Sequence, residues 1–359
     1  MIAYLYAKFS LNQTNSRDTF AYAFSNAAFA IQQSSYPSIR KFYANFRAAQ
    51  QIRYAWGTSH LPDENYFWNL AITNLHTALQ DSTIPAAEIG DACNEAADNL
   101  LLNTNTRSAF FHQIEAPLFR DWTNTYVCWL LQGQYFIDAA WAKRGSGYAN
   151  TVTDEGWKLF ANSLDEADIC LNHAWELNQS DPRIPLKMIT VVLGKQRSRD
   201  KMEIWFNRAM ALDPNYYDAC SAKLYYLEPK WYGSKEDMLE FGRECVTNQI
   251  WGGHIPLILL DAHKSIQRQY VDDSEKGNYW KQPEVWSDLK AAFDRFFELN
   301  PDASGWYQDY AWYAYQAEQW DTLNRIIPKL GPINYSFFGG TNEFNKMIKL
   351  SQEHASNSK

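Results

Sequence analysis

The stretch between Trp205 and Cys245 constrains the fold of this chain more than any other segment. In and just before it, apolar residues recur at steps of three and four, which is the spacing of one helix face. These residues are Met202, Trp205, Phe206, Ala209 and Leu212. Asp213-Pro214 then predicts the end of one helix and the beginning of the next, because Asp can cap a first turn and Pro fits the first helical position.

The same pattern continues through two more helices. A second apolar face predicts a helix that ends before Pro229, since the residue preceding a proline is disfavoured in the α conformation. Tyr232-Gly233-Ser234 predicts a turn in which Ser234 caps a third helix. Short amphipathic helices joined by short turns must pack side by side to bury their apolar faces. The segment therefore indicates an all-α fold.

The rest of the chain repeats helix and turn, and no strand pattern of comparable strength is present. We expect about fifteen helices, among them a short one over Arg107–Glu115 and a longer one over Pro117–Lys143. A polar break at residues 103–106 predicts an internal boundary. The predicted organisation is an N-terminal helical subdomain over residues 1–104, a helical array over residues 105–350 and a disordered tail over residues 351–359.

Three segments share a similar ending, AWELNQSDP, AMALDPN and FFELNPD. Pro182 and Pro214 stand 32 positions apart, close to the tetratricopeptide period of about 34 residues. The 87 positions between Pro214 and Pro301 are not a whole number of such periods. We therefore predict an irregular tetratricopeptide-like array of antiparallel helix pairs, which is an α-solenoid.

Two stretches resemble signatures of a known family. The first runs from Ala142 through the loop Arg144–Val152 to Thr153, with the following Glu155-Gly156-Trp157, and the second is Leu227–Ser234. They look like recurring signatures of an uncharacterised, mostly bacterial, tetratricopeptide-like family that is known only as a domain of unknown function. The resemblance covers about residues 135–330. It implies a helical-repeat fold and supplies no catalytic residues.

Charge and hydropathy argue against several classes of partner. The net charge is −8, and Lys and Arg are scattered, so we expect no nucleic-acid binding. No segment approaches the roughly 20 apolar residues of a membrane span, so we expect no membrane insertion. The first residues place Lys8 behind a short apolar patch and show no charged n-region, and we expect a cytoplasmic location. Nothing in the sequence indicates an oligomeric state.

Cysteine usage favours thiols over disulfides. The chain has five widely spaced Cys, mostly on apolar helix faces, and free Cys is commonly buried. We predict buried free thiols at Cys93, Cys128, Cys170, Cys220 and Cys245.

The sequence carries no HExxH, zinc-spaced Cys/His, GxSxG or P-loop motif. His112 with Glu115, and His173 with Glu176, stand three apart and are interpreted as surface helix pairs. Gly145-Ser146-Gly147 lacks the Lys and the paired base of a catalytic or phosphate loop, so its glycines are interpreted as conformational. We predict no catalytic residues, no metal and no cofactor, and we favour a non-enzymatic function.

Aromatic residues form 16% of the chain, and several stand next to glycine in predicted turns. These turns are Trp56-Gly57, Gly147-Tyr148, Trp231-Tyr232-Gly233, Trp251-Gly252-Gly253 and Phe338-Gly339-Gly340. In one interpretation, each aromatic ring seals the end of a helix pair. In the other, some of the rings line a shared groove, because Trp and Tyr offer flat apolar area together with a donor.

The second interpretation defines the candidate binding residues, which are Arg144, Tyr148, Lys230, Trp231, Tyr232 and Trp251. The leading hypothesis is a non-enzymatic module that binds a protein or peptide partner, and it depends on analogy of fold. The alternative is a carbohydrate-binding or glycan-active α/α protein. The enzymatic version of that alternative requires two carboxylates about 5–9.5 Å apart across an aromatic cleft.

Overall fold

The computed structural model describes residues 16–99, 104–145, 147 and 149–357. Within these ranges every regular element is a helix and no strand is present. The prediction of an all-α fold is confirmed. None of the helices in the described part is long and apolar enough to cross a membrane. The chain divides into two compact units, residues 1–195 and residues 196–359.

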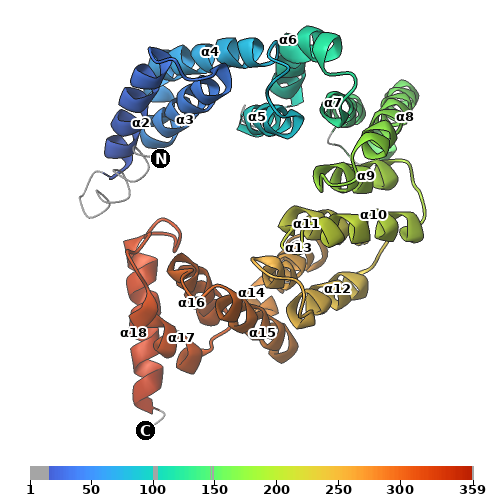
Figure 1. Cartoon of the computed structure of the whole chain (residues 1–359). Helices are drawn as coiled ribbons and strands as arrows, with labels where there is room; N and C mark the ends of the chain where they lie inside the picture. Colours follow the sequence, from blue (N-terminus) through green and yellow to red (C-terminus); the bar gives the residue numbers. More distant parts are fainter. Residues whose placement is uncertain (1–15, 100–103, 146, 148, 358–359) are drawn as a thin grey trace. The chain divides into compact units, whose positions relative to one another are not determined.

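In the first unit, helices that follow one another in sequence pack together (Figure 1). They are α2 (Ser16–Gln32), α3 (Ser38–Trp56), η1 (Gly57–His60), α4 (Leu61–Ala78), α5 (Ala86–Asn99), α6 (Thr104–Asp121), α7 (Tyr126–Arg144), η2 (Ala149–Thr151), α8 (Asp154–Leu177) and α9 (Arg183–Gly194). Small residues of α2 let that helix approach α3 closely. Ala21, Ala28, Ala49, Ile52 and Phe67 are members of one buried cluster shared by α2, α3 and α4.

The second unit contains the remaining helices. They are α10 (Arg199–Leu212), α11 (Tyr217–Tyr226), α12 (Lys235–Thr247), η3 (Ile255–Leu257), α13 (Ile258–Tyr270), α14 (Lys276–Tyr279), α15 (Pro283–Leu299), η4 (Ser304–Trp306), α16 (Tyr307–Gln316), α17 (Trp320–Ile326), η5 (Ile327–Lys329) and α18 (Thr341–Asn357). The segment from Trp205 to Cys245 contributes to α10, α11 and α12, and α10 ends before Asp213-Pro214 as predicted. The predicted start of the next helix at Pro214 is wrong, because α11 begins at Tyr217 and the side chain of Asp213 accepts from the amide of Asn215 within the turn. Ser234 caps α12, and its hydroxyl accepts a hydrogen bond from the amide of Asp237 at 3.0 Å.

Aromatic stacking holds α15 against α16. The rings of Phe293 and Tyr310 are 4.4 Å apart and nearly parallel, and those of Phe297 and Tyr307 are 4.1 Å apart. All 15 Trp residues lie in the described ranges, and none of them is exposed. Much of the aromatic excess therefore contributes to helix packing. The five cysteines are free and buried, as predicted.

The division into units differs from the predicted boundary near residue 104. Helix α5, which precedes residue 104, packs against α6 and α7, which follow it. The indole of Trp122 also donates to the carbonyl oxygen of Leu79 at 2.8 Å, across the same position. Contacts of this kind keep residues 1–195 in one unit.

Two smaller predictions are wrong. Pro117 lies inside α6 and does not begin a new helix; the break falls after Asp121, next to the buried Trp122. Of the predicted disordered tail over residues 351–359, residues 351–357 are helical, because α18 continues through Asn357, and residues 358–359 lie outside the described residues. Ser351 is buried, and its carbonyl oxygen accepts from the side-chain amide of Asn324 at 3.0 Å.

Ion pairs connect α3 to α5 and α5 to α9 in the first unit. Arg40 contacts Glu88 at 2.8 Å, and Arg183 contacts Asp91 at 2.9 Å. Arg183 also donates through Nε to the buried Asp181 at 2.8 Å. Burial by itself would raise the pKa of Asp181, but the hydrogen bonds and charge of Arg183 outweigh it and lower that pKa below its ordinary value.

We therefore predict that Asp181→Asn destabilises the first unit by about 1–3 kcal/mol at neutral pH. Because the folded state lowers this pKa, the stabilisation is complete above the ordinary pKa of about 4 and is lost as the pH falls through the folded-state value. Urea unfolding of the wild type and the variant should give free energies that converge below about pH 4. Asp91→Asn, at an exposed partner of the same arginine, serves as the control and should cost less than about 1 kcal/mol. A constant gap between wild type and Asp181→Asn at every pH would contradict the assignment.

Candidate functional site

Arg144 ends α7 and is engaged by its own loop. Its Nη1 donates to the carbonyl oxygens of Gly145 and Gly147, each at 3.1 Å. Its guanidinium lies over the rings of Trp141 and Trp157, at 5.7 and 5.3 Å from their centroids. These contacts hold the loop against α7 and α8. The predicted Tyr148 lies outside the described residues.

The predicted residues Lys230, Trp231 and Tyr232 form the turn between α11 and α12. Each aromatic ring packs on a ring of α11: Trp231 lies 5.7 Å from Tyr225, and Tyr232 lies 4.9 Å from Tyr226. Gly233 is required by close backbone approach, since a Cβ there would lie 2.2 Å from the carbonyl oxygen of Leu227. The rings therefore cover the C-terminal end of α11.

A buried carboxylate fixes this turn to α13. Glu228 is 5% exposed, and its carboxylate pairs with Lys230 and accepts from the hydroxyl of Ser265 at 2.9 Å. Lys230 also donates to the side-chain oxygen of Gln269 at 3.2 Å and lies over the ring of Tyr225. The Lys230 ammonium thus neutralises a charge that burial would otherwise make costly.

Trp251 packs elsewhere in the second unit. Its ring meets Phe206 of α10 at 5.7 Å and Phe241 of α12 at 6.4 Å, both edge to face. The amide of Gly252 donates to the carbonyl oxygen of Pro214 at 3.3 Å, just before α11 begins. The Trp251 loop and the Lys230 turn therefore lie at opposite ends of α11, a helix of ten residues.

The structure brings only part of the predicted set together. Lys230, Trp231 and Tyr232 are neighbours, whereas Trp251 lies beyond α11 from them. Arg144 belongs to the first unit, and the other four described residues belong to the second. The contacts described above join these side chains to their own turn or to an adjoining helix.

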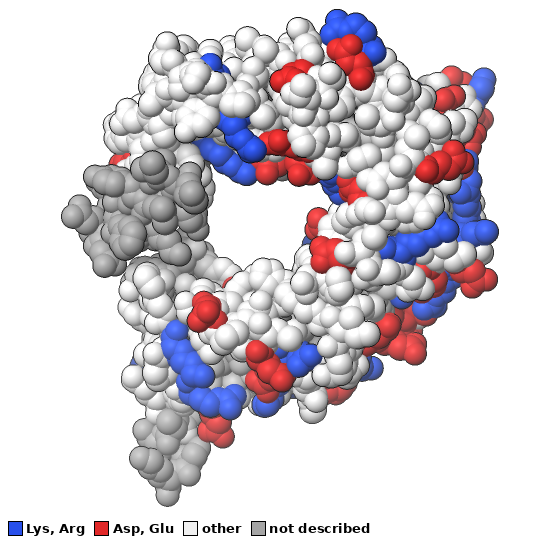
Figure 2. All heavy atoms as spheres, in the orientation of Figure 1, with Lys and Arg blue, Asp and Glu red and all other residues white. Residues whose placement is uncertain are grey.

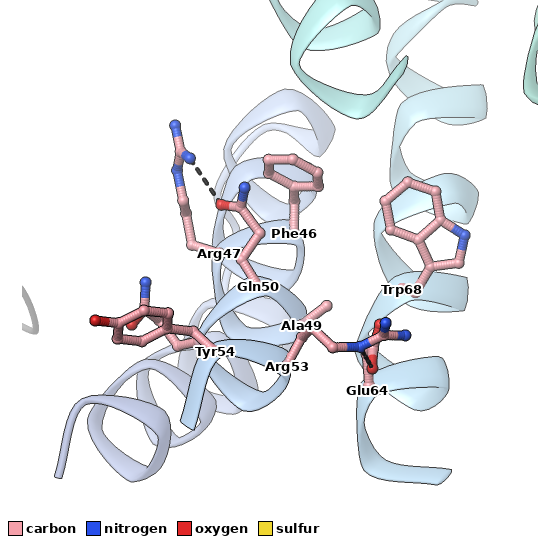
Figure 3. A pocket seen from close by; sticks show the side chains of 9 residues that line it. Phe46, Arg47, Ala49, Gln50, Arg53, Tyr54, Glu64 and Trp68 are labelled. Carbon is pink, nitrogen blue, oxygen red and sulfur yellow. Dashed lines mark hydrogen bonds and ion pairs between the residues drawn. The ribbon is translucent and has the colours of Figure 1, made fainter. Parts of the chain in front are cut away.

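A more open site lies between α3 and α4 in the first unit (Figure 3). This pocket, here named the α3–α4 pocket, has a volume of about 480 Å³. Each helix supplies one wall, and the lining residues of α3 can share a face because residues three and four positions apart are neighbours on a helix surface. Its lining residues include Phe46, Arg47, Ala49, Gln50, Arg53, Tyr54, Glu64 and Trp68.

The α3–α4 pocket has an apolar floor. Phe46 and Ala49 are almost completely buried, and the ring of Phe46 lies 6.0 Å from that of Trp68 across the two helices. Because Ala49 is small, α3 leaves a hollow between Phe46 and Arg53 instead of filling it. Apolar floors with a few polar groups at the rim are typical of ligand pockets.

Charged groups stand at both ends of the α3–α4 pocket (Figure 3). At one end Arg47 donates to the side-chain oxygen of Gln50 and to Glu95 of α5, each at 2.7 Å. At the other end Arg53 donates through Nε to Glu64 of α4 at 2.6 Å. The side chains of Arg47 and Arg53 are 42% and 34% exposed, so both guanidiniums remain accessible to a ligand.

Sequence reasoning does not identify the α3–α4 pocket. Phe46 and Ala49 belong to an ordinary apolar helix face, and Arg47 and Arg53 look like solvent-exposed charges. The pocket results from the packing of α3 on α4, which no motif encodes. The only local signal in the sequence is that Arg47 and Arg53 flank Gln50-Gln51, with Trp68 on the next helix, and this pattern is not specific.

A second pocket, of about 450 Å³, lies among α14, α16, α17 and α18. It has two carboxylates and an aromatic wall, the elements that the carbohydrate alternative requires. Glu318 pairs with Lys281 at 2.6 Å, and Glu343 pairs with Lys346 at 3.2 Å. Each of these carboxylates is therefore already matched by a lysine.

The described residues offer little for metal chemistry. His112–Glu115 and His173–Glu176 form the surface pairs that their spacing predicts, at 3.2 and 3.3 Å. In the described ranges no group of three or more His, Cys, Asp or Glu side chains is arranged to hold a metal ion.

Figure 2 shows Lys and Arg interspersed with Asp and Glu on the face in view, separated by wide uncharged areas.

No protein-family model matches the sequence, and no curated protein matches it significantly.

We predict that Lys230→Ala destabilises the second unit by about 1–2 kcal/mol, because it leaves the buried Glu228 without its cation. The double variant Lys230→Ala with Glu228→Gln should recover part of that loss. Lys201→Ala, at an exposed position of α10, should change the free energy of unfolding by less than about 0.5 kcal/mol. Urea denaturation of the four proteins measures all three effects. Equal stability of Lys230→Ala and wild type would show that the ion pair contributes nothing to the turn.

Proposed function

We propose that the chain is a tetratricopeptide-like helical-repeat module that binds a protein or peptide partner, with the α3–α4 pocket as its principal anchor site. The observation that carries the proposal is the pocket itself. It combines an apolar floor at Phe46 and Ala49 with a partly buried Trp68 on the α4 wall and accessible arginines on α3. Sites of this kind hold one projecting side chain of a partner segment.

The packing of the helices supports this proposal. Sequential helices contact one another in each unit, and α10, α11 and α12 follow the helix–turn–helix pattern of the repeats. Helical repeats of this kind present surface grooves between neighbouring helices. The α3–α4 pocket is such a groove, and it is closed at one end by the Arg53–Glu64 ion pair.

The size and openness of the α3–α4 pocket favour a partner segment over an enclosed small substrate. Its walls include exposed side chains such as Tyr54, which is 62% exposed. Glu64, the acidic residue among those that line the pocket, is already paired with Arg53. A binding function needs only this apolar floor and polar rim, whereas acid–base catalysis needs a positioned, unoccupied titratable group.

A peptide selection tests the proposal. Random peptides displayed on phage are selected on the immobilised full chain, and selected peptides are measured by isothermal titration calorimetry. Trp68→Ala should raise their Kd at least about tenfold, because it removes one wall of the anchor site. Trp129→Ala, at another half-buried tryptophan of the first unit, is the matched control and should leave Kd unchanged.

Two outcomes would contradict the proposal. One is the absence of any enriched peptide, which together with binding on a glycan array would favour the carbohydrate alternative. The other is enriched peptides whose Kd does not change in Trp68→Ala, because they would bind elsewhere on the chain. Circular dichroism of both variants establishes that each retains its helix content.

A further inference from the structure

Three sulfur atoms meet inside the second unit, one from each of the helices α10, α11 and α12. The thiol of Cys220 donates to the thioether sulfur of Met210, and 3.8 Å separates the two sulfurs. Cys245 in turn forms a hydrogen bond with Cys220. Cys220 thus contacts both of the other sulfurs, and the three residues are here named the sulfur triad. None of them is more than 5% exposed.

The fold, and not a sequence motif, brings the sulfur triad together. Met210 and Cys220 stand 10 positions apart, and Cys220 and Cys245 stand 25 apart, so neither spacing belongs to a zinc motif. Helix α11 contacts both α10 and α12. The apolar faces that bury these three short helices therefore also place the three sulfurs in one interface, where free Cys and Met side chains are commonly found.

The separation of the sulfurs suits one metal ion. A thiolate lies about 2.3 Å from the metal ion that it binds. At that distance, two sulfur ligands of one trigonal or tetrahedral ion are about 3.8–4.0 Å apart. Met210 and Cys220 already have this separation, at 3.8 Å.

The ligand set selects the kind of metal. Two thiols and one thioether are soft ligands, which favour soft ions such as Cu(I). Structural Zn(II) sites take four Cys or His ligands. In the part of the chain that the structure describes, no third Cys, His, Asp or Glu joins the two thiols in a metal-binding group. Mg(II) and Ca(II) require oxygen ligands. The triad therefore matches Cu(I), which is satisfied by three sulfurs.

The charged groups around the sulfur triad decide how an ion binds. Burial raises the pKa of Cys245, and its hydrogen bond to Cys220 raises it further. The charge of Glu244 acts in the same direction, whereas the ammonium of Lys223 lowers that pKa. Cys245 is therefore a neutral thiol without metal, and an ion must displace its proton. Two thiolates with one Cu(I) carry a net charge of −1, which the buried Lys223 partly offsets.

We propose that Met210, Cys220 and Cys245 form a binding site for one Cu(I) ion in the core of the second unit. Binding forms two copper–thiolate bonds and one copper–thioether bond and releases the two thiol protons to water, with no change of oxidation state. Because the sulfurs are buried, the ion enters when the helices open locally. The site lies in the second unit, whereas the α3–α4 pocket lies in the first, so the inference does not depend on peptide binding.

A competition titration tests the site. The reduced full chain is titrated with Cu(I) in the absence of oxygen, in the presence of bicinchoninate, which forms a coloured complex with Cu(I). The wild type should withhold one Cu(I) per chain from the chelator. Cys220→Ala should weaken Cu(I) binding at least about a hundredfold, because loss of a ligand costs more than loss of a group that only supports one. X-ray absorption at the copper edge should show sulfur neighbours only.

Variants of similar volume separate ligation from packing. Met210→Leu removes the thioether and nearly retains the volume of the side chain, so the fold should persist while Cu(I) binding weakens about tenfold. Met347→Leu, at a buried methionine of α18, is the matched control and should leave the affinity unchanged. Cys93→Ala, at a buried cysteine of the first unit, should also leave it unchanged. Circular dichroism of each variant establishes that its helix content is retained.

Several results would overturn the inference. One is a folded wild type that yields all of its Cu(I) to the chelator. Another is an equal loss of affinity in Cys93→Ala and Cys220→Ala, because the ion would then have no preferred thiol. Loss of the ion in Cys128→Ala would place it between α7 and α8 instead, where Cys128 and Cys170 are neighbours. Unchanged affinity in Met210→Leu would contradict the assignment of three sulfur ligands.

Discussion

The burial of apolar helix faces is the constraint on which the rest of this structure depends. Helices such as α10 and α11, with 14 and 10 residues, are too short to be stable alone and gain their stability from packing. Large rings provide much of that packing, as in the stacked pairs Phe293–Tyr310 and Phe297–Tyr307. The same requirement explains why none of the Trp side chains is exposed, although most are only partly buried.

The same packing determines where a ligand can enter. Where the facing side chains are large, as between α15 and α16, the interface is filled. Where Ala49 stands between Phe46 and Arg53, a hollow remains, with an arginine at each end. By contrast, the polar groups around the Lys230 turn already bind one another. Lys230 pairs with Glu228 and donates to Gln269, and Ser265 donates to Glu228. The α3–α4 pocket is therefore the better site for an anchor residue.

The sequence predicts local features well, because their causes are local. Ser234 caps α12 through a hydrogen bond three residues away, and the end of α10 before Asp213-Pro214 follows from residue type alone. Features set by distant contacts are missed. The break after Asp121 depends on Trp122 bonding to Leu79, 43 positions earlier, and Ser351 is helical because α17 and α18 pack together. The candidate site is missed for the same reason, since only the packing of α3 on α4 unites Phe46 with Trp68.

Hydrogen–deuterium exchange of the full chain with and without a selected peptide tests the central claim most directly. Backbone amides in α3 and α4, the helices that line the pocket, should exchange more slowly when the peptide is bound, because it suppresses their local opening. Exchange in α11 and in the turn around Lys230 should not change. Protection confined to that turn, with α3 and α4 exchanging as in the free protein, would contradict the assignment of the α3–α4 pocket as the binding site.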